Sequence, residues 1–168
     1  VLSRNPGGKI IFDVKCTRNL APWISQHGGT PIMWKTGHSF IKSKLIETQA
    51  LLAGEMSGHL FFKERWYGFD DGLYAGARLL ELLSHQADIN AALNDLPDSL
   101  NTPELQIRMA EGENHTLIAQ LQKNAVFSSA QQVITIDGLR VEYSDGFGLA
   151  RASNTTPVVV LRFEADNE

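Results

Sequence analysis

The chain has 168 residues, of which 43% are hydrophobic and 20% charged, a composition typical of a folded globular protein with one large core or two small ones. The formal net charge of −4 and the lack of basic runs interleaved with aromatic residues argue against nucleic acid as a partner. No stretch approaches the roughly 18 continuous apolar residues of a membrane span, so we expect no membrane contact.

The single cysteine, Cys16, cannot form an internal disulfide, and the first residues lack the charged and apolar regions of a secretory signal. Both features predict a cytoplasmic protein. Because the chain starts at Val1 and ends at Glu168, directly after an apolar strand, we expect a fragment. Asn114-His115-Thr116 and Asn154-Thr155-Thr156 match the glycosylation triplet, a chance match in the cytoplasm and the main basis for a third hypothesis, a secreted glycoprotein domain.

The first half of the chain alternates short apolar runs with amphipathic segments. Apolar runs bounded by turn-forming residues predict strands, and a 3.6-residue periodicity predicts helices. In chain order we expect a strand at 9–14, a helix at 19–26, a strand at 31–34, a helix at 39–48, a strand at 50–53, and helices at 73–84 and 89–96. Because strands and helices alternate, this half should form an α/β domain whose mostly parallel sheet is flanked by helices.

A turn-rich passage, 97–103, separates this half from the rest of the chain. It predicts one domain at 1–97 and a second at 98–168. In the second domain we expect a strand at 104–110, a helix at 115–125, and strands at 132–137, 139–143, 147–151 and 157–164. A helix followed by a meander of strands joined by short turns predicts an α+β domain.

The segment Gly54-Glu55-Met56-Ser57-Gly58-His59 lies between two apolar runs. In an extended chain alternate side chains share a face, so Glu55, Ser57 and His59 would project together. The carboxylate and hydroxyl suit the vicinal hydroxyls of a sugar, and the imidazole can carry charge for a phosphate or move a proton near neutral pH. A hairpin or β-bulge with ordinary polar surface groups explains the same pattern.

A second polar loop, Arg151-Ala152-Ser153-Asn154-Thr155-Thr156-Pro157, lies between two predicted strands. A planar guanidinium, hydroxyls, an amide and backbone N–H groups in a tight turn suit a phosphate dianion. The chain carries no Gly-rich phosphate loop of the Lys-Ser/Thr type. A loop built from turn-forming serine and asparagine remains the alternative.

Lys15 and the pair Gly37-His38 each follow a predicted parallel strand, and Gly54 to His59 follow the next one. Ligands of open parallel sheets usually bind at the carboxyl ends of strands. These residues should therefore lie along one rim, although each alone is an ordinary loop residue.

Other residues carry less functional signal. Asp70-Asp71 is better explained as a helix N-cap than as a metal pair, and the five histidines lack zinc-ligand spacing. Cys16 has no evident base partner in the sequence and is interpreted as an incidental thiol. We therefore expect no metal ligand in this chain.

Four motifs together resemble the α-D-phosphohexomutase superfamily, and within it the bacterial phosphomannomutase/phosphoglucomutase branch. They are DVKCTR at 13–18, MWKTGH at 33–38, GEMSGHLFFKERWYGFDDG at 54–72 and RASNTTP at 151–157. The resemblance implies that the chain holds most of the third domain of such an enzyme and most of the fourth, whose α+β fold is TATA-binding-protein-like. It also implies that the phosphoserine loop and the Mg2+-binding loop lie in domains absent from this chain.

The resemblance implies an intramolecular phosphotransferase of the isomerase class, a monomer that interconverts the 1- and 6-phosphates of glucose and mannose. A phosphoserine would donate and recover the phosphoryl group, with glucose 1,6-bisphosphate as intermediate and activator. Phosphoryl transfer of this kind relies on Mg2+ and positive side chains to stabilise the charge of the transferring group. This fragment, inactive alone, would bind and orient the phosphosugar. The alternative hypothesis is a stand-alone, non-catalytic sugar-phosphate-binding module.

The resemblance also implies roles for particular residues. Glu55 and Ser57 would hold the sugar 3- and 4-hydroxyls, and His59 would face the reacting end as an acid or base. Since glucose and mannose differ only at C2, this arrangement predicts dual specificity. The remaining implied contacts are with the phosphosugar for Lys15, Gly37 and His38, and with its remote phosphate for Arg151, Ser153, Asn154 and Thr155.

Overall fold

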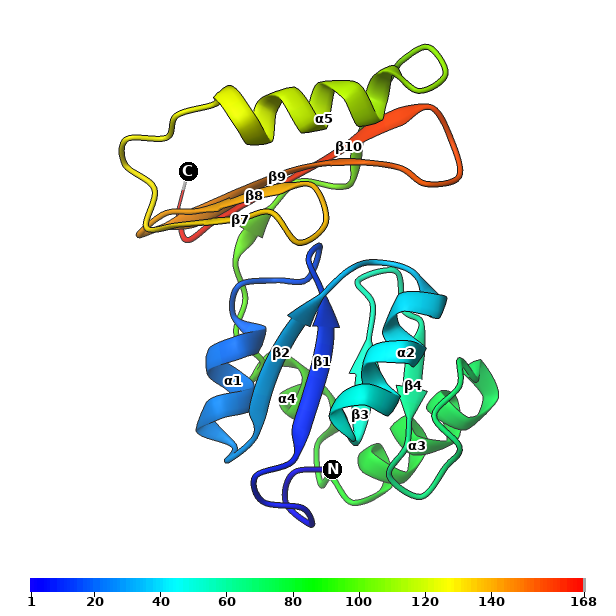
Figure 1. Ribbon diagram of the computed structural model, residues 1–168. Coiled ribbons are helices and arrows are strands. Elements are labelled where there is room, and N and C mark those ends of the chain that lie inside the picture. The colour runs from blue at the N-terminus through cyan, green and yellow to red at the C-terminus, as the bar shows by residue number, and fades with distance from the viewer. Residues whose placement is uncertain (168) are drawn as a thin grey trace. The chain divides into compact units, whose positions relative to one another are not determined.

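The computed structural model describes residues 1–167, which form two compact units, Val1–Asp98 and the residues from Ser99 onward (Figure 1). This division lies one residue beyond the boundary expected from the sequence. Within the described part of the chain, no helix has the length and apolar character needed to cross a membrane. Each unit has its own sheet and is described by itself.

The first unit is built on a four-stranded sheet with the order β2-β1-β3-β4. The three strands β1, β2 and β3 are parallel, and β4 returns antiparallel to β3. The bounds are β1 (Lys9–Asp13), α1 (Leu20–Gln26), β2 (Thr30–Trp34), α2 (His38–Thr48), β3 (Leu52–Gly54), β4 (Leu60–Phe62), α3 (Gly72–Ser84) and α4 (Ile89–Asn94). This is the α/β arrangement expected from the alternation of strands and helices.

Helices cover both faces of this sheet because alternate residues of β1 point to opposite sides. Phe12 packs with Ile24 of α1 on one face. Ile11 packs with Ile41 of α2 on the other. The central strand is therefore apolar on both faces, which explains its continuous apolar run.

The third strand begins later than the sequence predicts, at Leu52 instead of Ala50. Ala50 is fully buried, but its N–H donates to the carbonyl of Leu45, at the end of α2. Gln49 takes a left-handed conformation with φ of 56° and ends the helix. Burial at Ala50 thus belongs to the end of a helix, a distinction that an apolar run does not reveal.

Helix α3 docks on its sheet through polar and aromatic residues. Asp71 caps its N-terminus by accepting from Tyr74 N at 2.9 Å, as the sequence predicts for this acidic pair. Arg78 stacks its guanidinium over Phe62 of β4, 4.6 Å from the ring centroid. Several of its leucines are instead exposed, Leu73 to 91% and Leu80 to 69%. Among the described residues, these apolar side chains of α3 are left uncovered.

The second unit is an antiparallel six-stranded sheet with the path β5-β10-β9-β8-β7, and β6 also pairs with β10. Helix α5 covers one face through Ile118, which packs with Val159 and Ala152. The bounds are β5 (Leu100–Asn101), β6 (Leu105–Arg108), α5 (Glu113–Asn124), β7 (Gln132–Ile134), β8 (Leu139–Glu142), β9 (Gly146–Ala152) and β10 (Val158–Ala165). The predicted α/β domain followed by an α+β domain is confirmed.

Candidate functional site

Three loops leave the same edge of the first sheet. The register pairs Asp13 with Trp34 and Phe12 with Gly54, so β1, β2 and β3 end side by side. This edge is the carboxyl end of a parallel sheet, where ligands usually bind. The loops that follow carry the predicted site residues Lys15, Gly37, His38, Glu55 and Ser57.

The segment between β3 and β4 is a tight hairpin, not an extended chain. Glu55 N donates to the carbonyl of His59 at 2.9 Å, and Gly58 N donates to the carbonyl of Glu55 at 2.9 Å. The apolar run 60–62 pairs antiparallel with β3, which forces the chain to reverse here. The prediction that three alternate side chains share one extended face is therefore wrong.

The hairpin nevertheless brings Glu55 and Ser57 together. Ser57 Oγ donates to Glu55 Oε2 at 3.4 Å. The Glu55 residue is only 8% exposed, and its Oε1 has no hydrogen-bond partner among the described residues. A buried carboxylate oxygen without a donor is costly, so Oε1 is an acceptor suited to a ligand hydroxyl.

His59 is oriented by a different carboxylate. Its Nδ1 lies 2.6 Å from Oδ2 of Asp70, which forms an isolated β-bridge with Phe61 of β4. With Nδ1 donating to the carboxylate, Nε2 is left as the acceptor of the neutral ring. The His59 side chain is about half exposed, so a ligand can reach the imidazole. Asp70, which the sequence suggested only as a helix cap, instead holds this imidazole.

The other two loops at this edge differ in exposure. Lys15 is buried just beyond β1, whereas His38 is the exposed first residue of α2. Gly37 precedes it with φ of 126°, a conformation that favours glycine. No described side chain caps α2, so the N–H groups of its first turn suit an anion such as a phosphate.

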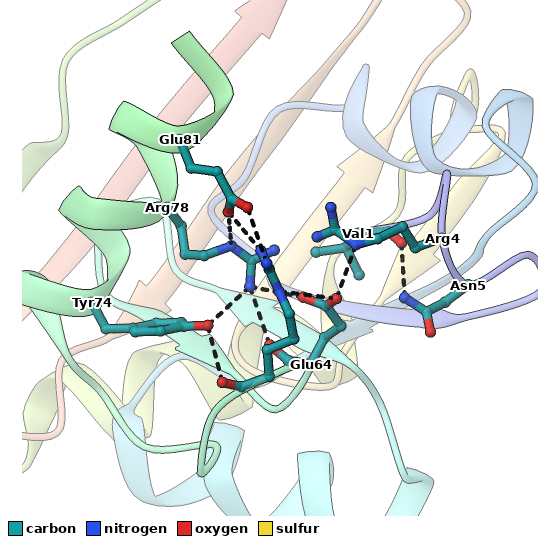
Figure 2. A network of polar contacts seen from close by, with 8 residues as sticks. Val1, Arg4, Asn5, Glu64, Tyr74, Arg78 and Glu81 are labelled. Carbon is teal, nitrogen blue, oxygen red and sulfur yellow. Dashed lines mark hydrogen bonds and ion pairs between the residues drawn. The ribbon is translucent and has the colours of Figure 1, made fainter. Parts of the chain in front are cut away.

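A polar network fixes the chain that follows β4 (Figure 2). Glu64 accepts from Arg4 Nε at 3.2 Å and pairs with Arg78 Nη1 at 2.8 Å, and Arg78 also pairs with Glu81 at 3.2 Å. Burial acts to raise the pKa of Glu64, but the hydrogen bonds from Arg4 and Arg78 outweigh it and hold the pKa below its usual value. These charges are paired with one another, which indicates a structural role.

In the second unit, Arg151 of β9 is largely buried and held by the β7–β8 connection. Its Nε donates to Asp137 Oδ2 at 3.1 Å. The neighbouring Gly138 has φ of 85°, and a Cβ built there would lie 2.5 Å from the Arg151 Cβ. This close approach fixes the place of the Arg151 backbone, while Asp137 fixes its guanidinium.

The loop after Arg151 is organised by the Ser153 hydroxyl. Its Oγ accepts from Thr155 N and Thr156 N, each at 3.3 Å, and from Thr156 Oγ1 at 3.0 Å. This is a serine turn, so Ser153 has the turn-forming role that the alternative interpretation assigned to it. Asn154 and Thr155 are exposed at the tip.

Sequence analysis missed the residue that supports this loop, Asn114 of α5. It is 2% exposed, and its Nδ2 donates to three carbonyls, those of Ser153 at 3.1 Å, Val158 at 3.3 Å and Thr156 at 3.4 Å. The glycosylation triplet at 114–116 is thereby overturned as a modification site, because its amide is buried and occupied. No spacing in the sequence marked Asn114 as a loop support.

Among residues 1–167, no group of three or more His, Cys, Asp or Glu side chains is arranged to hold a metal ion. Asp70 and Asp71, the acidic pair in the sequence, are engaged by His59 and by the start of α3. The family resemblance, for its part, implies that Mg2+ is bound by a domain outside this chain.

Comparison with known proteins identifies both units. Residues 2–100 match the family model described as phosphoglucomutase/phosphomannomutase, alpha/beta/alpha domain III, and residues 104–168 match its C-terminal domain. A phosphoglucomutase of Neisseria meningitidis serogroup A is 66% identical over the whole chain, which spans 37% of that protein. A phosphomannomutase/phosphoglucomutase of Pseudomonas aeruginosa is 59% identical over the whole chain, which spans 36% of it.

A solved structure agrees with these matches. The crystal structure of a phosphoglucomutase/phosphomannomutase family protein from Burkholderia thailandensis superimposes with a TM-score of 0.93 at 66% identity, covering 99% of this chain and 35% of that one. The chain therefore spans little more than a third of the relatives it matches. It belongs to the phosphoglucomutase/phosphomannomutase family.

Proposed function

We propose that this chain is the sugar-phosphate-binding part of a phosphohexomutase, which interconverts hexose 1-phosphates and hexose 6-phosphates. The observation that carries the proposal is the buried Glu55 carboxylate, whose Oε1 has no donor among the described residues and whose Oε2 holds Ser57. A buried carboxylate beside a hydroxyl, on a loop at the carboxyl edge of a parallel sheet, is suited to adjacent sugar hydroxyls. The names of the relatives supply the reaction class.

Glu55 and Ser57 would bind the sugar at O3 and O4. A hydroxyl at either position can donate to Glu55 Oε1, and Ser57 Oγ can accept or donate to its neighbour. Glucose and mannose have the same configuration at both positions and differ at C2. A loop that reads O3 and O4 should therefore accept both sugars.

Phosphate binding would use cationic groups from each unit. In the first, Lys15, His38 and the uncapped start of α2 suit a phosphate. In the second, the Arg151 guanidinium and the exposed Asn154 and Thr155 side chains at the loop tip suit one as well. Arg151 is held in place by Asp137, which would orient its guanidinium before the ligand arrives.

His59 would move the proton of the reacting sugar hydroxyl. As a phosphoserine outside this chain gives its phosphoryl group to that hydroxyl, the O–H bond breaks and His59 Nε2 takes the proton. The serine oxygen leaves as the P–O bond breaks and finally recovers a proton, which yields a sugar bisphosphate such as glucose 1,6-bisphosphate. Reversal at the other phosphate regenerates the phosphoserine. Asp70 would stabilise the imidazolium formed in between.

Some parts of this proposal lie beyond the described residues. Mg2+, when bound, would neutralise charge on the transferring phosphoryl group, but the described residues hold no ligand cluster for it, and no step here depends on it. We expect the chain alone to bind ligand without catalysing the interconversion. A monomeric state and a cytoplasmic location are parts of the same proposal.

The test is an amide NMR titration of the chain with glucose 1,6-bisphosphate and with mannose 6-phosphate. Signals of Glu55, Ser57 and the 151–155 loop should shift with both ligands. Glu55→Gln, which keeps the shape of the side chain, should weaken binding about tenfold, because a charged acceptor is lost. Glu47→Gln, at an exposed position of α2, is the matched control and should leave affinity unchanged. If neither loop responds to either ligand, the proposed site is wrong.

A further inference from the structure

One carboxylate at the end of β1 connects the three loops at the edge of the first sheet. Asp13 is the last residue of β1, the strand that lies between β2 and β3, and its side chain is fully buried. It is not among the residues that the motifs single out for ligand contact. Its position at the centre of the sheet lets it reach both neighbouring strand ends.

The two Asp13 oxygens accept from residues on three different loops. Oδ1 lies 3.2 Å from the backbone N of Met56 in the β3–β4 hairpin and 3.1 Å from the Sγ of Cys16 in the loop after β1. Oδ2 lies 2.8 Å from Thr36 Oγ1, in the loop before α2. Each donor is next to a residue of the proposed ligand site: Glu55 and Ser57, Lys15, and Gly37 respectively.

The chemistry of these contacts suits a carboxylate in particular. An ionised carboxylate only accepts hydrogen bonds and has room for several donors on its two oxygens. The three donors here are a peptide N–H, a thiol and a hydroxyl, all neutral. Hydrogen bonds to a charged acceptor are shorter and stronger than neutral ones, so one buried group can hold three separate segments.

We propose that Asp13 is a positioning residue that sets the three loops of the sugar-phosphate site relative to one another. Holding Met56 N fixes the peptide that joins it to Glu55, and with it the direction of the Glu55 carboxylate. Holding Thr36 fixes the approach to Gly37 and the start of α2. The inference rests on the proposed function, because positioning matters only if these loops bind the ligand.

The proposal predicts coupling between loops that are distant in the sequence. Thr36→Val removes one donor to Asp13 with little change of shape. The amide proton of Met56, 20 positions later, should then shift, because both groups share one carboxylate. Asp13→Asn should move the same Met56 signal upfield, since a neutral acceptor replaces a charged one. When Asp13→Asn is already present, Thr36→Val should shift the Met56 amide signal less than it does in the original chain.

The matched control is Ile11→Val, two residues earlier on β1 and fully buried. It should lower the stability of the unit by creating a small cavity, yet leave the Met56 amide and the exchange rates of the three loops as in the original chain. Asp13→Asn should speed amide exchange in all three loops. Loss of stability alone would change the two variants alike, so the comparison separates positioning from general destabilisation.

Binding of mannose 6-phosphate completes the test. Asp13→Asn should weaken it about tenfold and Ile11→Val should not change it. If Thr36→Val and Asp13→Asn shift the Met56 amide signal no more than Ile11→Val does, the positioning role is overturned. This holds even when the original chain binds the sugar. If the original chain does not bind the sugar while the Met56 signal moves as predicted, the proposed function fails and the connection between the loops stands.

Discussion

Each of the two candidate loops is held by a buried polar side chain, a hydrogen-bond acceptor in the first unit and a hydrogen-bond donor in the second. In the first unit, the Asp13 carboxylate accepts from the hairpin at Met56 N. In the second, the Asn114 amide donates to the carbonyls of Ser153, Thr156 and Val158. One loop is therefore held through a backbone N–H group and the other through backbone carbonyls.

The two supports also serve different proposed contacts. The hairpin would present the Glu55 carboxylate to sugar hydroxyls, which donate hydrogen bonds. The Arg151 loop would present a guanidinium, oriented by Asp137, to a phosphate, which accepts them.

Among variants that test how the two loops are held, Gly138→Ala should have the largest effect on stability. The residue has φ of 85°, and its Cβ would lie 2.5 Å from the Ala150 carbonyl oxygen and from Arg151 Cβ. The left-handed conformation and the clash with backbone together should cost about 2–5 kcal/mol of unfolding free energy. Gly112→Ala is the control, because φ is 79° there but nothing lies within 4 Å. Equal loss of stability in both variants by chemical denaturation would refute the close-packing argument.

The next effect should come from Asn114→Asp, which replaces the donor with an acceptor of the same shape. At neutral pH the carbonyls of Ser153, Thr156 and Val158 lose the Asn114 donor and face a buried carboxylate instead, so the unit should lose about 1–3 kcal/mol. Burial and the facing carbonyl oxygens disfavour the charged form and should raise the pKa of the introduced carboxyl, so stability should partly return as the pH falls. Asn154→Asp at the exposed tip should be nearly neutral at every pH. Thermal unfolding from pH 4 to 8 measures both variants.

A smaller effect is expected from Ser153→Ala. Its hydroxyl organises the exposed tip of the loop and carries less buried structure than Asn114 does. We expect a loss of about 0.5–1 kcal/mol, with faster amide exchange at Thr155 and Thr156 only. A loss as large as that of Asn114→Asp would mean that the loop is held mainly by its own turn.

The smallest effect, confined to acid, concerns the charge network around Glu64 in the first unit. The pKa of Glu64 lies below its ordinary value of 4.5, so its pairing stabilises the fold above that pH and this contribution is lost as the pH falls through the lowered pKa. As the pH falls, amide protection relative to the intrinsic exchange rate should therefore decrease near Glu64 before it decreases in the loop that the uncharged Asn114 holds. In Glu64→Gln this acid dependence should be absent. The opposite order of opening would show that Glu64 does not control the acid response.

The sequence predicted the elements whose apolar pattern is sustained. The alternation of strands and helices was enough to predict helices flanking the first sheet, where Ile11 packs with α2 and Phe12 with α1. It could not separate the end of α2 at Ala50 from the start of β3, because burial is the same in both. It also missed that α3 docks through Tyr74 and Arg78, which both pack against the Phe62 ring, since such ring contacts leave no periodic signal.

For the candidate site, sequence reasoning proposed residues for ligand contact and missed the side chains that hold their loops in place. Glu55, Ser57 and Arg151 stand out by type and by glycine or turn context. Asp13 and Asn114 do not, because their partners are distant in the sequence and include backbone atoms, which carry no residue identity. Such supports become visible only when the fold brings the segments together.

The most direct test of the account is a crystal structure of the chain with mannose 6-phosphate bound. The account predicts Glu55 Oε1 about 2.7 Å from a ring hydroxyl at C3 or C4, with the hairpin unchanged and Asp13 still bonded to Met56 N. A sugar bound away from Glu55, or a Glu55 Oε1 that accepts from a protein group instead, would contradict it.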